Sequence, residues 1–133
     1  MREIKHKVWD KQNKRFTDKL TALYQNGVIV IYNPLTGNYY QPNQDEFIPI
    51  LYTGLKDKNG VEIYEDDRLY DGAGSYRGVH FVINRAAYYA GELRLTKALA
   101  SKLEVAGNKY EYPDIADYLR SKTYHPIQPK DKP

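Results

Sequence analysis

Apolar and polar residues alternate in several short stretches of this chain, and each such stretch predicts a β-strand. In residues 3–10 an apolar side, which includes His6, alternates with a mostly basic side, as in a strand with two different faces. The polar residues 10–15 then predict a turn. Residues 27–32 form the most apolar run, short and β-branched, and predict a strand buried on both faces.

Turn-forming residues separate these strands. Residues 33–38 contain proline and glycine and predict a hairpin in which Tyr32 and Tyr39 face each other. Residues 47–53 predict another strand. Pro49 interrupts it and indicates an edge or a bulge at that point, because proline cannot donate to a sheet ladder.

Three further strands are predicted at residues 68–71, 78–84 and 92–95, separated by breaks that contain glycine. Residues 96–103 are rich in helix formers and favour a helix, although they could also extend the preceding strand into a hairpin. The succession of short strands predicts a mainly β protein with a compact, small barrel-like or sandwich-like domain.

The last predicted element is a short C-terminal helix at residues 113–120. Asp114 near its start and Arg120 near its end match the helix dipole. Residues 123–133 are rich in proline and lysine and predict an extended or disordered tail. The expected organisation is a single domain over residues 1–122, followed by this tail.

Composition narrows the possible classes of protein. The 133 residues contain no cysteine, which removes disulfides and thiol chemistry, and no apolar run approaches the length of a membrane span. We therefore expect a soluble, cytoplasmic protein with no membrane association. The 14 tyrosines suit half-buried sheet positions, or alternatively a platform on which bases stack.

The stretch YTGLKDKNGVEIYEDD, residues 52–67, holds the densest group of candidate chemical side chains. Asn59 and Gly60 predict a hairpin turn, for which both can adopt positive φ. A calcium loop centred on Gly60 would place Leu55 at its first ligand position, which leucine cannot fill. A magnesium site of residues 65–67 is disfavoured because successive side chains of an extended segment point to opposite faces. We therefore expect no bound metal and no cofactor.

Catalytic motifs are also missing. The sequence has no nucleophile elbow, no phosphate-binding loop and no dinucleotide fingerprint, and none of its three histidines stands beside a suitable partner. We therefore expect no enzymatic activity and no catalytic residues.

Three segments together resemble the YopX-type proteins of bacteriophages and prophages: MREIKHKVWD, YTGLKDKNGVEIYEDDRLY and LEVAGNKYEYPDIADYL. One departure is Asp66, which stands where the family tends to have glycine and so implies a different backbone angle or a tolerated strain. The resemblance implies a mainly β accessory protein without an assigned reaction. The positions that match the family are expected to be turn formers and sheet aromatics: Trp9, Gly54, Asp57, Asn59, Gly60, Tyr64, Asp67, Gly107 and Asn108.

Two functional hypotheses follow. The first is a binding or adaptor module that contacts an unidentified host or phage protein, or a second copy of itself through an edge strand. The alternative is nucleic-acid binding by the basic N-terminal strand together with more distant basic and aromatic residues: Lys5, Lys7, Lys11, Lys14, Arg15, Arg77, Arg85, Tyr88 and Tyr89.

Overall fold

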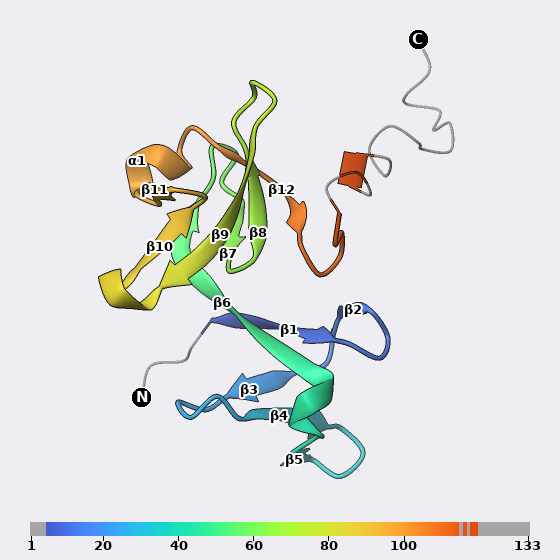
Figure 1. Cartoon of the computed structure of the whole chain (residues 1–133). Coiled ribbons are helices and arrows are strands. Elements are labelled where there is room, and N and C mark those ends of the chain that lie inside the picture. The colour runs from blue at the N-terminus through green and yellow to red at the C-terminus, as the bar shows by residue number, and fades with distance from the viewer. Residues whose placement is uncertain (1–4, 115, 117, 120–133) are drawn as a thin grey trace.

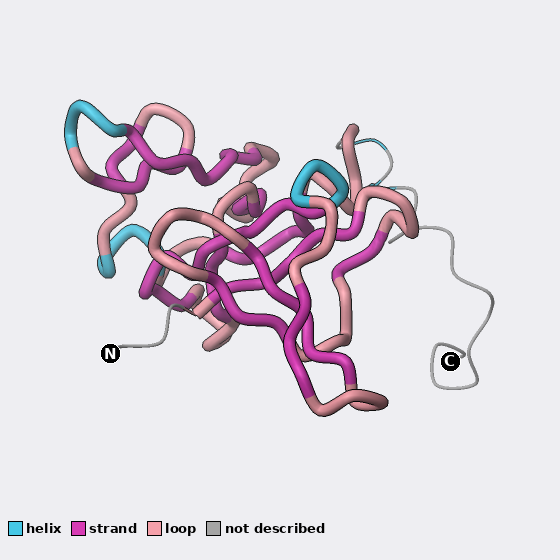
Figure 2. The backbone as a smooth tube through the Cα atoms, turned by 90° about the horizontal axis from the view of Figure 1, so that it is seen from below, coloured by secondary structure: helices cyan, strands magenta, loops and turns pink. Residues whose placement is uncertain are grey.

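The chain forms three antiparallel β-sheets, and the long strand β6 (Phe47–Lys56) runs between the upper and lower groups of strands in Figure 1. This computed structural model describes residues 5–114, 116, 118 and 119. Helical turns are few and short, as Figure 2 shows. The prediction of a mainly β fold is therefore confirmed.

The first sheet has the strand order β2–β1–β6–β7, and β6 is joined by β1 (His6–Asp10), β2 (Arg15–Phe16) and β7 (Glu62–Tyr64). The second has the order β11–β10–β9–β8–β12, with β8 (Asp67–Tyr70), β9 (Tyr76–Val82), β10 (Ala87–Ala90), β11 (Leu93–Arg94) and β12 (Glu104–Asn108). The third consists of β3 (Thr21–Leu23), β4 (Ile29–Asn33) and β5 (Asn38–Tyr40). The helical elements are the 3-10 turns η1 (Gln44–Glu46) and η2 (Ile83–Arg85) and the helix α1 (Lys97–Ala100).

Pro49 fits into β6 because the pairing there needs no N–H group from it. The backbone N–H of Tyr52 donates to the carbonyl of Lys5, so alternate residues of β1, counted from Lys5, bond to β6. Val8, which lies opposite Pro49, falls between those bonded positions. Strand β7 pairs with β6 only between Tyr52 and Lys56, so the part of β6 around Pro49 has a sheet partner on one side.

The apolar side chains form three clusters, and β1 contributes to two of them from its opposite faces. Val8 packs with Ile29 and Ile31, which joins the first sheet to the third. Trp9 packs on the other face with Ile50 and Tyr64. The third cluster joins β7 of the first sheet to the second sheet and to α1, and its buried members are Ile63, Leu69, Val79, Ala90, Leu95, Ala100 and Leu103.

Several local predictions are confirmed. Tyr32 pairs with Tyr39 across the β4–β5 hairpin, with ring centroids 5.4 Å apart. Residues 97–100 are helical, and the backbone N–H of Leu99 donates to the Thr96 hydroxyl at 3.1 Å, which caps this helix. In the 57–60 turn Gly60 has a positive φ of 80°, whereas Asn59, which can also adopt one, does not.

Strands β3, β10 and β12 were not expected from the pattern. Alanine at both ends of β10 favours helices, and β12 contains Gly107 and Asn108, which are depleted in strands. Pairing with β9 across a hairpin overrides the preference of β10, and long-range pairing with β8 overrides that of β12. In the predicted helix at 113–120, residues 116, 118 and 119 are helical, while residues 115, 117 and 120 and the predicted tail at 123–133 lie outside the described part. No helix in the described part is long and apolar enough to span a membrane.

Candidate functional site

The carboxylate of Asp57 holds two parts of the backbone together. Its side chain is buried, and its Oδ1 accepts hydrogen bonds from the N–H groups of Asn59 and Val61 at 2.8 and 2.9 Å. Its Oδ2 accepts from the N–H of Val105 in β12, at 2.9 Å. Asp57 therefore closes the β6–β7 turn and ties it to a strand 48 residues further along the chain.

Asp67 has a similar role at the start of β8. The backbone N–H of Tyr64 donates to its Oδ2 at 2.8 Å, and the amide of Asn108 donates to its Oδ1 at 3.0 Å. Burial raises the pKa of Asp67 to about 6, although both hydrogen bonds and the charge of Lys7 favour the ionised form. The amide of Asn108 also donates to the carbonyl of Glu65, so Asn108 ties β12 to the turn that precedes β8.

Glu65 contacts two other elements. Its Oε1 accepts from the backbone N–H of Leu51 at 3.0 Å, and its Oε2 accepts from the hydroxyl of Tyr88 at 3.0 Å. Burial, together with the nearby Glu65 carboxylate, raises the pKa of the Tyr88 phenol. Each carboxylate of the 52–67 stretch that faces inward is thus bonded to the fold.

Asp66 adopts the left-handed backbone conformation that a glycine would take without cost. Its φ is 67°, and its carboxylate pairs with the ammonium of Lys109 at 3.2 Å. The departure from glycine seen in the sequence therefore keeps a positive φ and adds an ion pair, since aspartate tolerates this region better than most residues.

Trp9 and Tyr64 pack as sheet aromatics and Gly60 lies in a turn, as expected, whereas Gly54 and Gly107, expected in turns, lie within β6 and β12 where the strand registers shift. Gly54, Gly60 and Gly107 all have positive φ, between 80° and 91°. A Cβ on Gly107 would lie 2.9 Å from the ring of Tyr112, so this backbone approaches the ring closely. Trp9 packs edge-on against Phe16 at 5.0 Å, and Tyr64 lies 5.5 Å from the ring of Tyr52.

The residues described by the structure contain no group of three or more histidine, cysteine, aspartate or glutamate side chains that could hold a metal ion. Asp57 and Asp67 accept hydrogen bonds from backbone and amide N–H groups, which ties both carboxylates to the turn and strand contacts of the fold.

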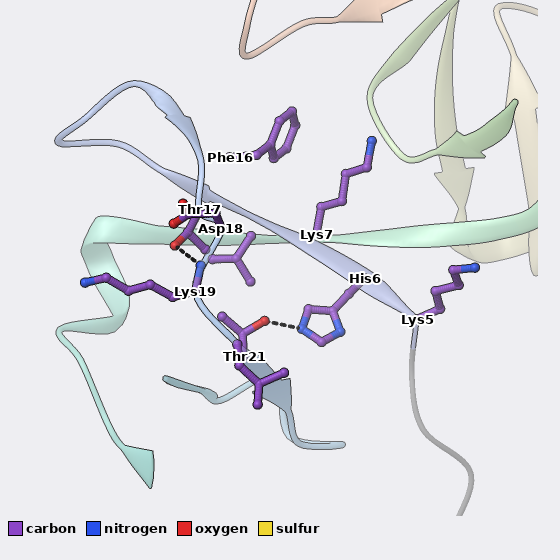
Figure 3. Close-up of a pocket in the computed structure, with 10 residues that line it drawn as sticks. Lys5, His6, Lys7, Phe16, Thr17, Asp18, Lys19 and Thr21 are labelled. Atoms are coloured by element: carbon purple, nitrogen blue, oxygen red, sulfur yellow. Dashed lines mark hydrogen bonds between the residues drawn. The ribbon is translucent and has the colours of Figure 1, made fainter. Parts of the chain in front are cut away.

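A groove of about 930 Å³ lies between β1 and the segment that leads from β2 to β3. Figure 3 shows Lys7 and Phe16 extending to one side of β1 while His6 meets Thr21 on the other, with 2.9 Å between His6 Nε2 and Thr21 Oγ1. Lys5 is ion-paired with Glu62, and the Lys7 ammonium lies 4.3 Å from the centre of the Tyr64 ring.

A second groove, of about 550 Å³, lies beside the first against the third sheet. Its lining is aromatic and apolar except for Asp18, Lys19 and Asn33, and consists otherwise of Leu20, Tyr32, Pro34 and Tyr40. Asp18, Lys19 and Leu20 line both grooves. The two hollows therefore meet along one face of the molecule.

The third sheet carries the main group of exposed apolar side chains. Leu35 at the tip of the β4–β5 hairpin is 94% exposed, and the other large exposed residues of this region are Leu20, Tyr24, Tyr39 and Tyr40. Residues 20–44 contain no aspartate, glutamate, lysine, arginine or histidine, although 28% of the whole chain is Asp, Glu, Lys or Arg. We refer to β3–β5 with these five exposed residues as the uncharged face; the name covers both sides of the third sheet, because the neighbours Tyr39 and Tyr40 point to opposite sides of β5.

Comparisons with known proteins place the chain in a family. A family model described as YopX protein matches residues 5–116. The chain belongs to the YopX protein family. No protein with a curated description matches its sequence significantly.

A solved structure has the same fold as this YopX family member. It is the crystal structure of protein EF1440 from Enterococcus faecalis, with a TM-score of 0.61 and 23% sequence identity over 84% of this chain and 96% of that chain. At this level of identity the similarity shows a shared fold alone.

The structure distributes the predicted nucleic-acid residues of this YopX family member over the first and second sheets. Lys5, Lys7, Lys11, Lys14 and Arg15 lie on β1, on β2 and in the turn between them. Arg77, Arg85, Tyr88 and Tyr89 belong to β9, η2 and β10 in the second sheet. The β1–β2 turn and the β9–β10 turn lie on opposite sides of the view in Figure 1.

The aromatic members of that set are also engaged. Tyr88 donates its hydroxyl to Glu65, and its ring packs edge-on against Phe81 at 5.1 Å. The hydroxyl of Tyr89 accepts a hydrogen bond from Arg85 at 2.8 Å. Through Glu65, which also accepts from the N–H of Leu51, Tyr88 is linked to β6 of the first sheet, whereas Tyr89 is bonded to Arg85 within the second. The nucleic-acid surface stays a prediction.

The uncharged face was not singled out from the sequence, although a signal for it existed. A run of 25 residues without a charged side chain, residues 20–44, stands out in a chain this rich in charge. The run does not show which of its apolar residues are exposed. That depends on how β4 packs against β1, which buries Ile29 and Ile31 and leaves Tyr39 and Tyr40 outside.

Proposed function

We propose that this YopX family member is a phage or prophage protein-binding module that acts in the cytoplasm of a bacterial host through its uncharged face. The observation that carries the proposal is the coincidence of five large exposed apolar residues with a segment devoid of charge. Interface centres are depleted in charged residues and enriched in tyrosine. Contiguous exposed apolar patches on a small protein also mark interaction sites.

The contacts of the acidic stretch support the same proposal. In the described part every buried side-chain nitrogen and oxygen has a hydrogen-bond partner, and Asp57 and Asp67 are bonded to the backbone. These groups therefore stabilise the fold, and we assign no reaction to them. The proposal accordingly includes no enzymatic activity.

Affinity capture with matched variants tests this function. The double variant Leu20→Ser, Tyr40→Ser alters the uncharged face, whereas Phe81→Ser, Ile83→Ser removes two exposed apolar residues from the region of β9 and η2. We expect the tagged wild type and the second variant to retain the same bacterial protein, and the first to lose it. The retained protein, once purified, should bind the wild type directly. Equal retention by both variants, or no direct binding, would overturn the proposal.

A further inference from the structure

We infer that the uncharged face binds a second copy of this chain, through antiparallel pairing of β5 with its counterpart around a two-fold axis near Tyr40. The inference rests on the face named in the proposed function and identifies a partner for it. Three features of the molecule support it: the open edge of β5, the register that this edge allows, and the lack of charge.

The open edge of β5 presents backbone hydrogen-bonding groups. β5 is an outer strand of the third sheet, and all three of its residues are exposed. The N–H of Tyr32 donates to the carbonyl of Leu20 on the β3 side, at 2.9 Å, so Tyr32 does not use its backbone groups toward β5. Tyr39, its partner across the hairpin, therefore directs its own N–H and C=O away from β4, to the open side.

The same alternation sets the register of the pair. After Tyr39, the next residue whose backbone faces outward is Gln41, and Pro42 beyond it lacks the N–H that a longer ladder would need. A two-fold axis through Tyr40 places Tyr39 of each copy opposite Gln41 of the other, and each such pair can exchange two hydrogen bonds. The two Tyr40 side chains then meet at the axis, at the close spacing of a pair without backbone bonds.

The lack of charge favours a second copy over a different partner. Across a two-fold axis each residue near the axis meets its own counterpart, so any charged side chain there would face the same charge. Proteins commonly protect an exposed edge strand with a lysine, another charge or a proline within it. β5 has none of these, and residues 20–44 contain no charged group at all. A strongly charged partner would meet no oppositely charged side chain on this face.

Sedimentation velocity over a wide range of concentration, on the full chain, tests the inference. We expect the mass to rise from 15.5 kDa toward twice that value. Tyr40→Lys should raise the dissociation constant of the dimer about tenfold or more, because two lysines would meet at the axis. Phe81→Lys is the matched control, since Phe81 is 45% exposed and Tyr40 43%, and it should leave the constant unchanged. Mixing Tyr40→Lys with Tyr40→Glu should restore dimers by pairing opposite charges.

Amide exchange provides a measurement that needs no variant. The N–H of Tyr39 should exchange more slowly as the wild-type concentration rises, while that of exposed His80 should not change. A wild type that stays monomeric, a Tyr39 amide insensitive to concentration, or equal effects of the two lysine variants would overturn the inference. If the protein is a monomer but still captures a bacterial protein through the uncharged face, this inference is wrong and the proposed function is supported. If it dimerises but captures no bacterial protein, this inference is supported and the proposed function is wrong.

Discussion

The carboxyl group of Asp67 lies where β8 begins, and burial raises its pKa to about 6. An aspartate in an unfolded chain titrates near pH 4, so between about pH 4 and 6 the folded protein binds more protons than the unfolded one. Asp67 therefore stabilises the fold fully below about pH 4, and this contribution is lost as the pH rises through about 6. Most carboxylates in proteins have the opposite effect, because their pKa falls on folding.

Asp67→Asn is expected to remove this pH dependence. The stability of the wild type relative to the variant should fall by about 3 kcal/mol between pH 4 and pH 7, since each pKa unit corresponds to about 1.4 kcal/mol. Urea unfolding of both proteins at a series of pH values measures this difference, and other titrating groups cancel in it. The prediction fails if the difference between the two proteins is the same at both ends of the range.

Gly107 is the position where a side chain would meet both backbone strain and a close neighbour. Its φ is 91°, and a Cβ would lie 2.9 Å from the ring of Tyr112 and 3.0 Å from that of Tyr118. Gly107→Ala should therefore lower the free energy of unfolding by about 2–4 kcal/mol. Gly54→Ala is the control, since Gly54 has a φ of 88° and nothing within 4 Å of its Cβ position, and should cost about 1–2 kcal/mol. If thermal or urea unfolding shows equal losses of stability for the two variants, the rings of Tyr112 and Tyr118 move aside without cost.

At the scale of elements, β12 joins the second sheet through only a few pairings with β8, and its register shifts between Val105 and Asn108. Two side chains from elsewhere secure it: Asp57 accepts from the N–H of Val105, and Asp67 accepts from Asn108. The side chains that resembled a metal site in the sequence thus stabilise the attachment of this strand.

Asp57→Ala should loosen the β6–β7 turn and β12 together. The change removes the acceptor of three backbone N–H groups, and we expect a loss of about 2–4 kcal/mol, since buried donors left unpaired cost about 1–3 kcal/mol each and water reaches some of them. Hydrogen exchange should become faster at Val105 as well as at Val61. Asp57→Asn keeps one oxygen acceptor, so its loss of stability should be smaller than that of Asp57→Ala. A change confined to the turn would contradict this account.

The elements that could be predicted from the sequence were those with a local cause. The apolar run that becomes β4 and the hairpin that pairs Tyr32 with Tyr39 depend on neighbouring residues. Strands β10 and β12 form against their local preferences: β9 supplies the hydrogen bonds of β10 across a hairpin, and β8, distant in the sequence, supplies those of β12. For the same reason the sequence showed that the acidic stretch contains a turn, but not which N–H groups its carboxylates bind.

At the scale of the whole molecule, the basic residues predicted to bind nucleic acid are divided between two sheets. One group lies around β1 and β2, and the other on β9 and η2. Lys5, in the first group, is paired with Glu62, which offsets its charge. The positive charge available to phosphate groups is therefore limited.

An oligonucleotide should consequently bind weakly, with a salt dependence corresponding to about one to three phosphate contacts rather than the roughly six to ten of a dedicated binding protein. Fluorescence anisotropy at a series of salt concentrations measures this slope. Lys14→Glu with Arg15→Glu, and separately Arg77→Glu with Arg85→Glu, should each have little effect on the residual binding. A steep slope that both double variants abolish would instead establish one continuous basic surface.

The sequence by itself determined the strand-rich class and the position of the turns around Gly37 and Gly60, because alternation of side chains and backbone preferences act between neighbours. Only the tertiary structure decided that Asp57 and Asp67 bind N–H groups from other elements and that the basic residues are divided between the first and second sheets. It also decided that the third sheet, which lacks charge, has β5 as an open edge strand. Those outcomes depend on which distant strands pair and in what register, since that pairing sets which side chains are buried and which meet.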